Sequence, residues 1–175
     1  MKKVIFFDGD GTLWYPAKTK RTVRPHWVYH DPSINNPWAE FVITPTARET
    51  LTELGEMGVK RVLLSTSPQS EEDAIISRIK AARQVDVYHL LDDVQVAPEY
   101  VEGKGERIVA LLSKYGFKTG DALMVGDTYK WDYESAANVG VEGLLIMSDY
   151  QQEYIEKLDK SRVITNLIEV INVID

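Results

Sequence analysis

Near its N-terminus the chain reads Val4-Ile5-Phe6-Phe7-Asp8-Gly9-Asp10-Gly11-Thr12. The four consecutive apolar residues predict a strand that is buried on both faces. Asp8 and Asp10 follow this strand directly, and in an open α/β sheet they would lie at the C-terminal edge, where such sheets bind ligands. Gly9 and Gly11 allow a sharp turn there and a close approach of the backbone to a ligand. The segment therefore predicts a core strand that ends in a candidate acidic site.

Two other structures fit this pattern of Asp and Gly. Asp-Gly pairs are typical of β-hairpin turns, and residues 4–12 alone leave that interpretation open. Calcium-binding loops also begin with Asp-x-Asp, but they require a bidentate Glu at the twelfth position. That position is Thr19 when counted from Asp8 and Arg21 when counted from Asp10, so the sequence argues against a calcium loop.

Length, charge and cysteine content narrow the classes of protein that fit. The chain has 175 residues, of which 44% are hydrophobic, which suffices for one domain with a sizeable core. The net charge of −7 argues against general binding to nucleic acids or membrane surfaces. Residues 14–31 differ, because four basic residues against the single acidic Asp31 give a local charge of +3. The absence of cysteine excludes disulfides, thiolate nucleophiles and cysteine-based metal sites.

The sequence carries no targeting or membrane signal that we recognise. Lys2 and Lys3 are followed by a short apolar segment that cannot form a signal peptide. No apolar run approaches the roughly 18 residues of a membrane span. We therefore expect a cytoplasmic protein without a membrane partner.

The segment from Leu13 to Ile43 has an unusual composition. It holds six aromatic residues, two histidines and four prolines without clean helical or strand periodicity. Loops of this length are usually functional, and so many aromatic side chains argue against disorder. We expect residues 13–43 to form an irregular flap, or small cap, within a single domain spanning residues 1–175. The alternative is a packed surface excursion whose aromatic side chains lie in the core.

The remaining sequence alternates between predicted helices and strands. Predicted helices begin at Thr44-Pro45 and end at Gly58, run from Ser67-Pro68 to about Arg83, begin at Lys104, and cover residues 133–139, 150–158 and 166–174. Predicted strands cover residues 59–65, 85–91, 94–97, 121–125 and 143–147. This alternation is typical of βαβ units and predicts an α/β fold with a parallel sheet. It disfavours the hairpin interpretation of residues 8–11.

Polar residues that follow the predicted strands should meet at one edge of the sheet. Right-handed crossovers would gather Asp8, Asp10, Ser65, Thr66 and Asp127 there, with Asp132 one turn after the last of them. Carboxylates packed this closely repel one another unless a cation joins them. Carboxylate oxygens together with water suit Mg²⁺, so we expect a magnesium site.

Magnesium beside an aspartate points to phosphoryl transfer. An aspartate such as Asp8 can attack phosphorus to form an aspartyl-phosphate, and Asp10 would protonate the leaving oxygen and later activate water. The equatorial oxygens of the phosphate need donors or positive charge, for which Ser65 and Lys104 are suitable. This chemistry does not need the histidines, which lack the spacing of metal ligands and are expected at the surface or in packing (His26, His30 and His89).

Four motifs in this order resemble those of the haloacid dehalogenase (HAD) superfamily. They are Asp8-Gly9-Asp10-Gly11-Thr12 after an apolar strand, Val62-Leu63-Leu64-Ser65, Lys104, and Gly126-Asp127 with Asp132 a turn later. They span most of the chain, and the first and fourth are the specific ones. Lys104 departs from the family pattern, because Gly follows it where the family often has Pro. Asp92-Asp93 mimics the fourth motif but precedes Lys104 and lacks the strand before it.

The resemblance implies roles for the first motif. Asp8 would be the nucleophile and a magnesium ligand. Asp10 would be the acid and base, and would offer its backbone carbonyl to the metal. Thr12 would orient Asp10. Superfamily dehalogenases lack the second aspartate, so Asp10 favours a phosphatase, although phosphomutases keep both aspartates.

The resemblance also implies roles for the residues of the other three motifs. Asp127 would be a metal ligand, and Asp132 would be a ligand through water or a supporting residue. Ser65, Thr66 and Lys104 would bind the substrate phosphate. The same resemblance implies that the chain adopts a Rossmann-like three-layer sandwich.

Caps inserted into this fold set specificity in the superfamily. No large cap fits between Ser65 and Lys104, because predicted elements use that sequence. The insertion at residues 13–43 is small and resembles that of the small magnesium-dependent phosphatase branch. Its basic residues are expected to attract a second anionic group, and its aromatic residues to stack on a sugar or base (Lys18, Lys20, Arg21, Arg24; Trp14, Trp27, Tyr29). The alternative for the basic residues is a solvated loop face.

The leading functional prediction is a Mg²⁺-dependent phosphomonoesterase that acts on a phosphorylated small molecule or an exposed phosphorylated group. Alternatives are a phosphotransferase or phosphomutase, and a processing factor for phosphorylated protein or nucleic-acid ends. A further alternative is a non-catalytic phosphate-binding or partner-binding domain, although such a relative would be expected to lose Asp8 or Asp10. Oligomerisation would be one way to cover an open pocket.

Overall fold

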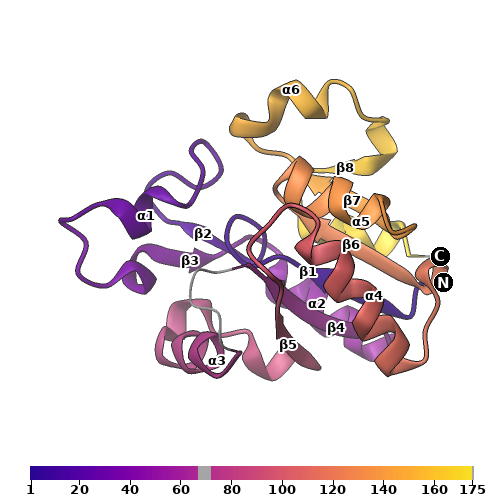
Figure 1. Ribbon diagram of the computed structural model, residues 1–175. Coiled ribbons are helices and arrows are strands. Elements are labelled where there is room, and N and C mark those ends of the chain that lie inside the picture. The colour runs from indigo at the N-terminus through magenta and orange to yellow at the C-terminus, as the bar shows by residue number, and fades with distance from the viewer. Residues whose placement is uncertain (67–71, 175) are drawn as a thin grey trace.

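The computed structural model describes residues 1–66 and 72–174, and a six-stranded parallel sheet lies at its centre (Figure 1). The strands occur in the order β5-β4-β1-β6-β7-β8. Their bounds are β1 Val4–Phe7, β4 Lys60–Ser65, β5 Asp93–Val96, β6 Ala122–Gly126, β7 Glu142–Ile146 and β8 Val163–Ile164. Since β1 pairs in parallel with β4 and β6, the hairpin interpretation of residues 8–11 is wrong.

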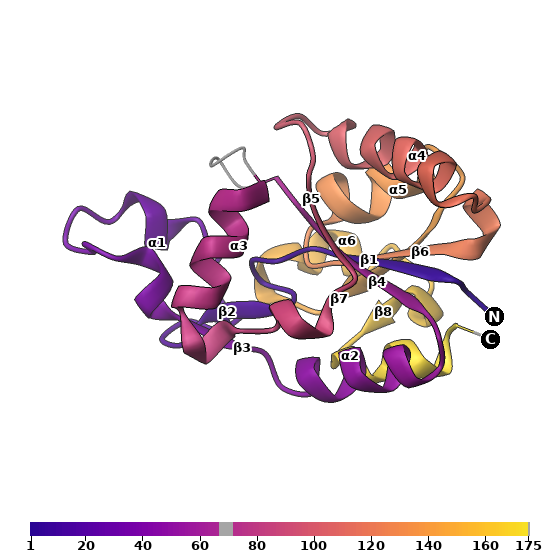
Figure 2. The same ribbon diagram turned by 90° about the horizontal axis from the view of Figure 1, so that it is seen from below.

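Helices cover both faces of the sheet (Figure 2). They are α1 Trp27–His30, α2 Ala47–Glu56, α3 Glu72–Ala81, α4 Gly103–Tyr115, α5 Ser135–Ala137 and α6 Gln152–Ile155, and the longest 3-10 helix is η8 Leu167–Asn172. Successive residues of a strand point to opposite faces. Ile5 and Phe7 therefore pack with α2 and η8, whereas Val4 and Phe6 pack with α4 and α5. The predicted Rossmann-like three-layer sandwich is confirmed.

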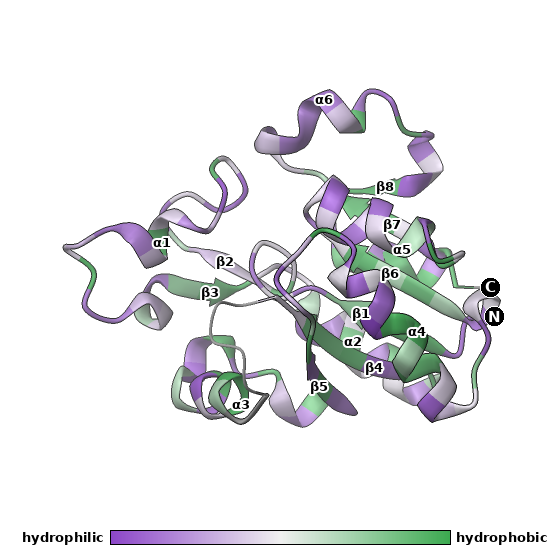
Figure 3. Ribbon diagram, viewed as in Figure 1, coloured by the Kyte–Doolittle hydropathy of each residue, from purple (hydrophilic) through white to green (hydrophobic). Residues whose placement is uncertain are grey.

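The hydrophobic residues are concentrated in the strands and on the helix faces that meet them (Figure 3). All four side chains of β1 are fully buried, as the unbroken apolar sequence at residues 4–7 predicts. In the part of the chain that the structure describes, no helix is both long and apolar enough to cross a membrane.

The first long helix begins later than the sequence indicates. Helix α2 starts at Ala47 after the left-handed residue Thr46, not at Thr44-Pro45. The hydroxyl of Thr44 does not cap the helix, because it donates to the carbonyl oxygens of Thr12 and Leu13 at 2.8 and 3.2 Å. This contact ties the end of the insertion to the loop after β1. The predicted end at Gly58 is confirmed, with a φ of +75°.

The predicted strand at residues 85–91 is wrong. This segment forms two 3-10 turns, η2 Arg83–Val85 and η3 Tyr88–Leu90, and the third strand of the core is β5 instead. The carboxylate of Asp86 accepts a hydrogen bond from the amide of Tyr88 at 3.1 Å. Such a local bond turns the chain where the sequence alternation indicates an extended strand. The predicted helix start at Ser67-Pro68 lies outside the described residues.

The C-terminal third also differs in detail from the predictions. A π-helix at Tyr129–Glu134 leads into α5 where a helix at 133–139 is predicted. The helix predicted at 150–158 shortens to α6 with a preceding 3-10 turn, η6 Asp149–Gln151, and that predicted at 166–174 is the 3-10 helix η8. Strand β8 was not predicted, because two residues carry no periodicity.

The insertion at residues 13–43 is more ordered than predicted. Strands β2 Trp14–Pro16 and β3 Phe41–Ile43 pair in an antiparallel hairpin, with α1 and the 3-10 turn η1 Pro37–Glu40 between them. The rings of Trp14, Trp38 and Phe41 lie in one cluster, with neighbouring centroids 5.5 and 5.8 Å apart. All three belong to the hydrophobic core. The alternative interpretation of a packed excursion therefore describes these aromatic residues better than an irregular flap. No large cap appears among the described residues.

Candidate active site

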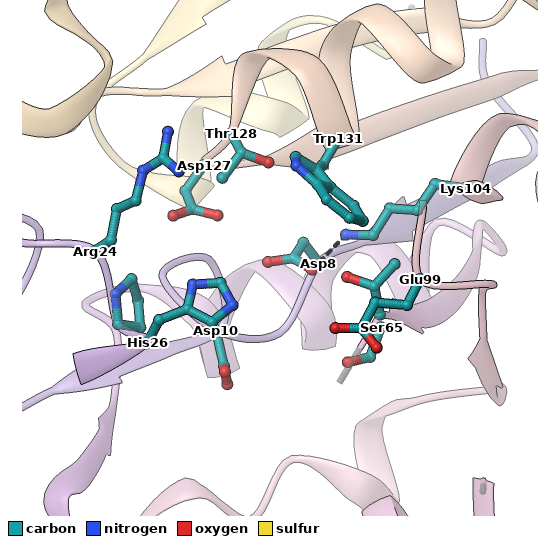
Figure 4. A pocket seen from close by; sticks show the side chains of 12 residues that line it. Asp8, Asp10, Arg24, His26, Ser65, Glu99, Lys104, Asp127, Thr128 and Trp131 are labelled. Carbon is teal, nitrogen blue, oxygen red and sulfur yellow. Dashed lines mark hydrogen bonds and ion pairs between the residues drawn. The ribbon is translucent and has the colours of Figure 1, made fainter. Parts of the chain in front are cut away.

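Three neighbouring strands deliver polar side chains to one edge of the sheet. Asp8 follows β1, Ser65 ends β4, and Asp127 follows β6, so the central strands of the sheet bring these residues together as predicted. A pocket opens between them (Figure 4). It is lined by Asp8, Asp10, Arg24, Pro25, His26, Ser65, Thr66, Glu99, Lys104, Asp127, Thr128 and Trp131.

Gly11 shapes the loop that carries the two aspartates. Its φ is +86°, and a Cβ atom built on it would lie 2.2 Å from Oδ2 of Asp127. Only glycine combines this left-handed backbone with so close a neighbour. The carbonyl oxygen of Gly11 accepts a hydrogen bond from Nε of Arg21 at 2.7 Å. Arg21 of the insertion therefore binds the backbone of this loop, and the side chain of Asp127 packs against the same glycine.

Three buried carboxylates and one buried ammonium form the centre of the site. Asp8, Asp127 and Asp132 each offer an oxygen, and these oxygens lie within 4.8 Å of one another. Lys104 Nζ donates to Oδ1 of Asp8 and to Oδ1 of Asp132, each at 2.5 Å. One positive charge thus faces three groups that are negative when ionised.

The electrostatics of this cluster favour a bound cation. Burial raises the pKa of Asp8 well above its ordinary value, and the neighbouring Asp132 and Asp127 add to this effect against the opposing charge of Lys104. Burial and the charge of Asp132 raise the pKa of Asp127 to about 7. Burial disfavours the charged form of Lys104, but Asp132 and Asp8 outweigh it and raise the pKa of this ammonium. Since hard cations such as Mg²⁺ prefer oxygen ligands, the three carboxylates of Asp8, Asp127 and Asp132 fit this ion.

Asp10 does not belong to this cluster. Its Oδ1 accepts a hydrogen bond from Nε1 of Trp14 at 2.6 Å, and its Oδ2 accepts one from the hydroxyl of Tyr29 at 2.7 Å. Figure 4 shows its carboxylate pointing away from Asp8 and Asp127. The hydroxyl of Thr12 has no hydrogen-bond partner within the described residues. No contact of this hydroxyl supports the prediction that Thr12 orients Asp10, which stays a prediction, whereas Trp14 and Tyr29 hold the carboxylate.

Comparison with protein families assigns the chain to a known group. The sequence model of the haloacid dehalogenase-like hydrolases matches residues 33–140. The chain belongs to the haloacid dehalogenase-like hydrolase family. The matched range includes Lys104, Asp127 and Asp132, and the predicted resemblance of the chain to the HAD superfamily is confirmed. A search of curated proteins gave no match.

Solved structures share the fold at low sequence identity. A haloacid dehalogenase-like hydrolase from Streptococcus pneumoniae is 18% identical, with a TM-score of 0.72 and 99% of each chain covered. An uncharacterised protein from Listeria monocytogenes serotype 4b is 19% identical, with a TM-score of 0.69 and 98% and 96% coverage of this chain and that one. D,D-heptose 1,7-bisphosphate phosphatase from B. bronchiseptica, complexed with magnesium and phosphate, is 15% identical, with a TM-score of 0.68 and 99% and 97% coverage.

The departure from the HAD pattern beside Lys104 has a structural reason. Gly105 stands where the family often has Pro, and its amide donates to Oγ of Ser135 at 2.9 Å. Proline has no amide hydrogen and could not make this bond. A Cβ atom at position 105 would also lie 2.3 Å from the carbonyl oxygen of Ser135. Glycine therefore lets α4 dock closely on α5, which places Lys104 in the site.

Asp132 is fixed by the loop that precedes it in this hydrolase. Its Oδ2 accepts hydrogen bonds from the amide and the hydroxyl of Thr128, at 2.9 and 2.7 Å. Its Oδ1 faces Lys104. A Cβ atom on Gly126 would lie within 2.4 Å of the Asp132 side chain, so the glycine before Asp127 makes room for this carboxylate.

The structure separates the predicted specificity residues. Arg24 lines the pocket, as does His26, which we expected at the surface or in packing. Arg21 instead bonds the carbonyl oxygens of Gly11 and Thr12 and lies over the ring of Tyr15, 5.2 Å from its centroid. The other predicted residues, namely Trp14, Lys18, Lys20, Trp27 and Tyr29, do not line the pocket.

Trp14 and Trp27 have other contacts that explain their absence from the pocket. Trp14 is only 1% exposed and is bonded to Asp10, which leaves no face for a sugar or base. Nε1 of Trp27 donates to the hydroxyl of Thr19 at 3.0 Å, and Lys18 lies over its ring at 5.9 Å. Trp14 therefore supports a residue of the pocket, and Trp27 makes its contacts within the insertion.

Several residues of the site were not predicted, and three of them have contacts or positions of interest. Trp131 and Glu99 line the pocket, and the hydroxyl of Tyr150 donates to Oδ2 of Asp127. Trp131 lies inside the fourth motif between Asp127 and Asp132, which was a usable signal. Tyr150 follows β7, the strand next to β6, and its position after the end of a strand was a weaker signal.

Proposed function

We propose that this HAD-like hydrolase is a Mg²⁺-dependent phosphomonoesterase that acts through an aspartyl-phosphate on Asp8. The observation that carries the proposal is the contact of Asp8 with Lys104 at the head of a pocket, beside two further buried carboxylates. The shared fold of a phosphatase complexed with magnesium and phosphate supports it, although sequence identity to that protein is 15%.

The proposed metal ligands are Asp8, Asp127 and Asp132, with the backbone carbonyl of Asp10. The three carboxylates are the only group of this kind among the described residues. When bound, Mg²⁺ neutralises these carboxylates and adds positive charge beside the phosphate oxygens. Ser65, Thr66 and Lys104 are proposed to bind the same phosphate, since all three line the pocket.

The proposed reaction has two steps. In the first, a carboxylate oxygen of Asp8 attacks phosphorus, the bond from phosphorus to the leaving oxygen breaks, and Asp10 gives its proton to that oxygen. In the second, water attacks phosphorus and loses a proton to Asp10, the bond between phosphorus and Asp8 breaks, and phosphate leaves. Each group returns to its starting state, so the cycle consumes only ester and water.

Residues 13–43 are proposed to act as a small cap on a single domain. Arg24 and His26 place positive or hydrogen-bonding groups at the mouth of the pocket, and Trp131 and Glu99 lie there as well. We propose that Arg24 attracts a second anionic group on a small phosphorylated substrate. Of the four basic residues in this segment, Arg24 is the one that lines the pocket.

Hydrolysis of p-nitrophenyl phosphate tests the chemistry. Wild type should release phosphate with Mg²⁺ and lose this activity with a chelator, and Asp8→Asn should be inactive. Asp159→Asn is a matched control, because the carboxylate of this exposed aspartate bonds only Ser161 among the contacts described. Activity that persists in Asp8→Asn would refute the aspartyl-phosphate.

A further inference from the structure

The insertion holds one carboxylate of the site, that of Asp10, which precedes it in the sequence. Both of its oxygens accept hydrogen bonds from residues 13–43: Oδ1 from Trp14 at 2.6 Å and Oδ2 from Tyr29 at 2.7 Å. No residue of the sheet or of its helices makes either bond. The orientation of Asp10 is therefore set by the insertion rather than by the core that holds Asp8 and Asp127.

The two donors are not equivalent. The indole N–H of Trp14 can only donate, so Oδ1 of Asp10 stays an acceptor whether or not the carboxyl carries a proton. The hydroxyl of Tyr29 can donate to the carboxylate and accept from the carboxylic acid. The Tyr29 contact therefore suits Asp10 both before and after a proton leaves it.

The position of Tyr29 is built into the insertion. Its ring packs against Phe41 of β3 with the centroids 5.8 Å apart, and Phe41 is fully buried. The neighbouring Val28 is also fully buried in the same core cluster. At the end of the insertion, Thr44 bonds the loop that carries Asp10. Helix α1 is thus packed against the core beside the contact, and the loop that carries Asp10 is held separately by Thr44, which argues against an incidental surface hydrogen bond.

We propose that Tyr29 is a positioning residue for Asp10, through which the 13–43 segment controls the acid–base step. This inference rests on the proposed phosphomonoesterase function. It gives the small cap a second task beside contact with the substrate, because a change in the cap would alter the alignment of Asp10. Tyr29 does not itself line the pocket, so it acts through Asp10 and not on the substrate.

The proposal makes the effect of Tyr29 depend on the leaving group. An alkoxide leaves poorly without a proton, so cleavage of an alkyl phosphate needs a well-placed acid. The p-nitrophenolate ion leaves readily and needs little help. The ratio kcat/KM reports only the steps up to release of the leaving group, so it isolates this use of Asp10 from its later use as a base.

Tyr29→Phe, which removes only the hydroxyl, provides the test. The variant should lower kcat/KM for glycerol 2-phosphate about tenfold and that for p-nitrophenyl phosphate less than about twofold. Tyr115→Phe is the matched control, because its hydroxyl also donates to an aspartate, Asp93, at 2.6 Å but far from the pocket. It should change neither value. An equal loss with both substrates, or no loss with glycerol 2-phosphate, would overturn the proposal.

A second measurement tests the contact between Tyr29 and Asp10 without an assay of enzymatic activity. Urea unfolding of wild type, Tyr29→Phe, Asp10→Ala and the double variant gives a double-mutant cycle. Tyr29→Phe should destabilise the wild type more than it destabilises Asp10→Ala, in which the hydroxyl has lost its acceptor. Additive effects would overturn the proposed contact. A wild type that hydrolyses neither ester would refute the proposed function and leave this second readout intact.

Discussion

Lys104 Nζ lies 2.5 Å from Oδ1 of Asp8, although 96 residues separate them in the chain. The same ammonium lies 2.5 Å from Oδ1 of Asp132. Both the ammonium and the carboxylates are buried, so each group depends on the others for compensation of its charge. The bridge joins the third and fourth motifs to the first and fixes the distance between the candidate nucleophile and the helix α4.

Lys104→Met should damage both stability and activity. Loss of the ammonium leaves Asp8 and Asp132 facing each other without compensation, and removal of one partner of a buried ion pair costs about 3 kcal/mol. Urea unfolding of the metal-free protein should show a loss of this size, and phosphatase activity should fall at least about a hundredfold. Lys114→Met, on the same helix but near its C-terminal end, is the control and should leave both near the wild-type values.

Magnesium should stabilise the protein more at pH 8 than at pH 6. Burial and Asp132 raise the pKa of Asp127 to about 7, above its ordinary 3.8. Between these two pKa values, 3.8 and about 7, the native state holds a proton that the unfolded chain lacks. The free energy of unfolding of the metal-free protein therefore falls as the pH rises through this range. Mg²⁺ binds the deprotonated cluster, and at pH 6 it must first displace that proton. Thermal unfolding with and without millimolar Mg²⁺ at both pH values measures the difference.

Asp127→Asn is the control for this pH effect. It removes the titrating carboxylate, so the gain in melting temperature from Mg²⁺ should be small and similar at the two pH values. A wild-type gain that is equal at pH 6 and pH 8 would contradict the assignment of Asp127 as a metal ligand.

Tyr150→Phe should weaken Mg²⁺ binding without abolishing it. The hydroxyl of Tyr150 donates to Oδ2 of Asp127 and so leaves the other oxygen oriented for the metal. Loss of a partner that orients a metal ligand typically lowers affinity by about 10-fold to 100-fold. Isothermal titration of the metal-free protein with Mg²⁺ measures this directly. Tyr154→Phe is the control, because Tyr154 stacks on the ring of Tyr129, with the centroids 4.5 Å apart, instead of donating to Asp127. Unchanged Mg²⁺ affinity in Tyr150→Phe would contradict the proposed role of Tyr150 in orienting Asp127.

Local sequence was enough to place the main elements of the sheet and the acidic edge. Residues 4–7 are apolar without interruption, and Asp8 comes directly after them, so strand and candidate nucleophile followed from one segment. The pairing of β1 with β4 and β6 then brought Ser65 and Asp127 beside it. These predictions succeeded because burial on both faces leaves a strong local signal.

The contacts made by the insertion could not be predicted from local sequence patterns. The bonds of Tyr29 to Asp10 and of Arg21 to Gly11 depend on how residues 13–43 fold back, and no periodicity encodes that path. The same limit explains residues 85–91, where alternation indicated a strand but Asp86 bonds the amide of Tyr88 and turns the chain. Short polar side chains that bond nearby backbone override weak propensity.

Gly11→Ala should be more harmful than Gly58→Ala, although both residues have a positive φ of +86° and +75°. An alanine at either position pays about 1 kcal/mol or more for left-handed backbone. At position 58 no atom lies within 4 Å of the new methyl group, whereas at position 11 Oδ2 of Asp127 lies at 2.2 Å. Urea unfolding should therefore show the larger loss for Gly11→Ala, and only this variant should lose Mg²⁺ affinity. Equal losses would mean that the loop relaxes away from Asp127.

Arg24 and Arg21 should respond differently to the same substitution. Arg24 is exposed and lines the pocket, so Arg24→Gln should lower kcat/KM about tenfold for substrates with a second anionic group and leave p-nitrophenyl phosphate nearly unchanged. Arg21 bonds the carbonyl oxygens of Gly11 and Thr12, so Arg21→Gln should instead loosen the loop that carries Asp8 and lower activity with every substrate. A screen of phosphate esters with and without a second phosphate or carboxylate separates the two outcomes. If Arg24→Gln affects all esters equally, its proposed role in specificity is wrong.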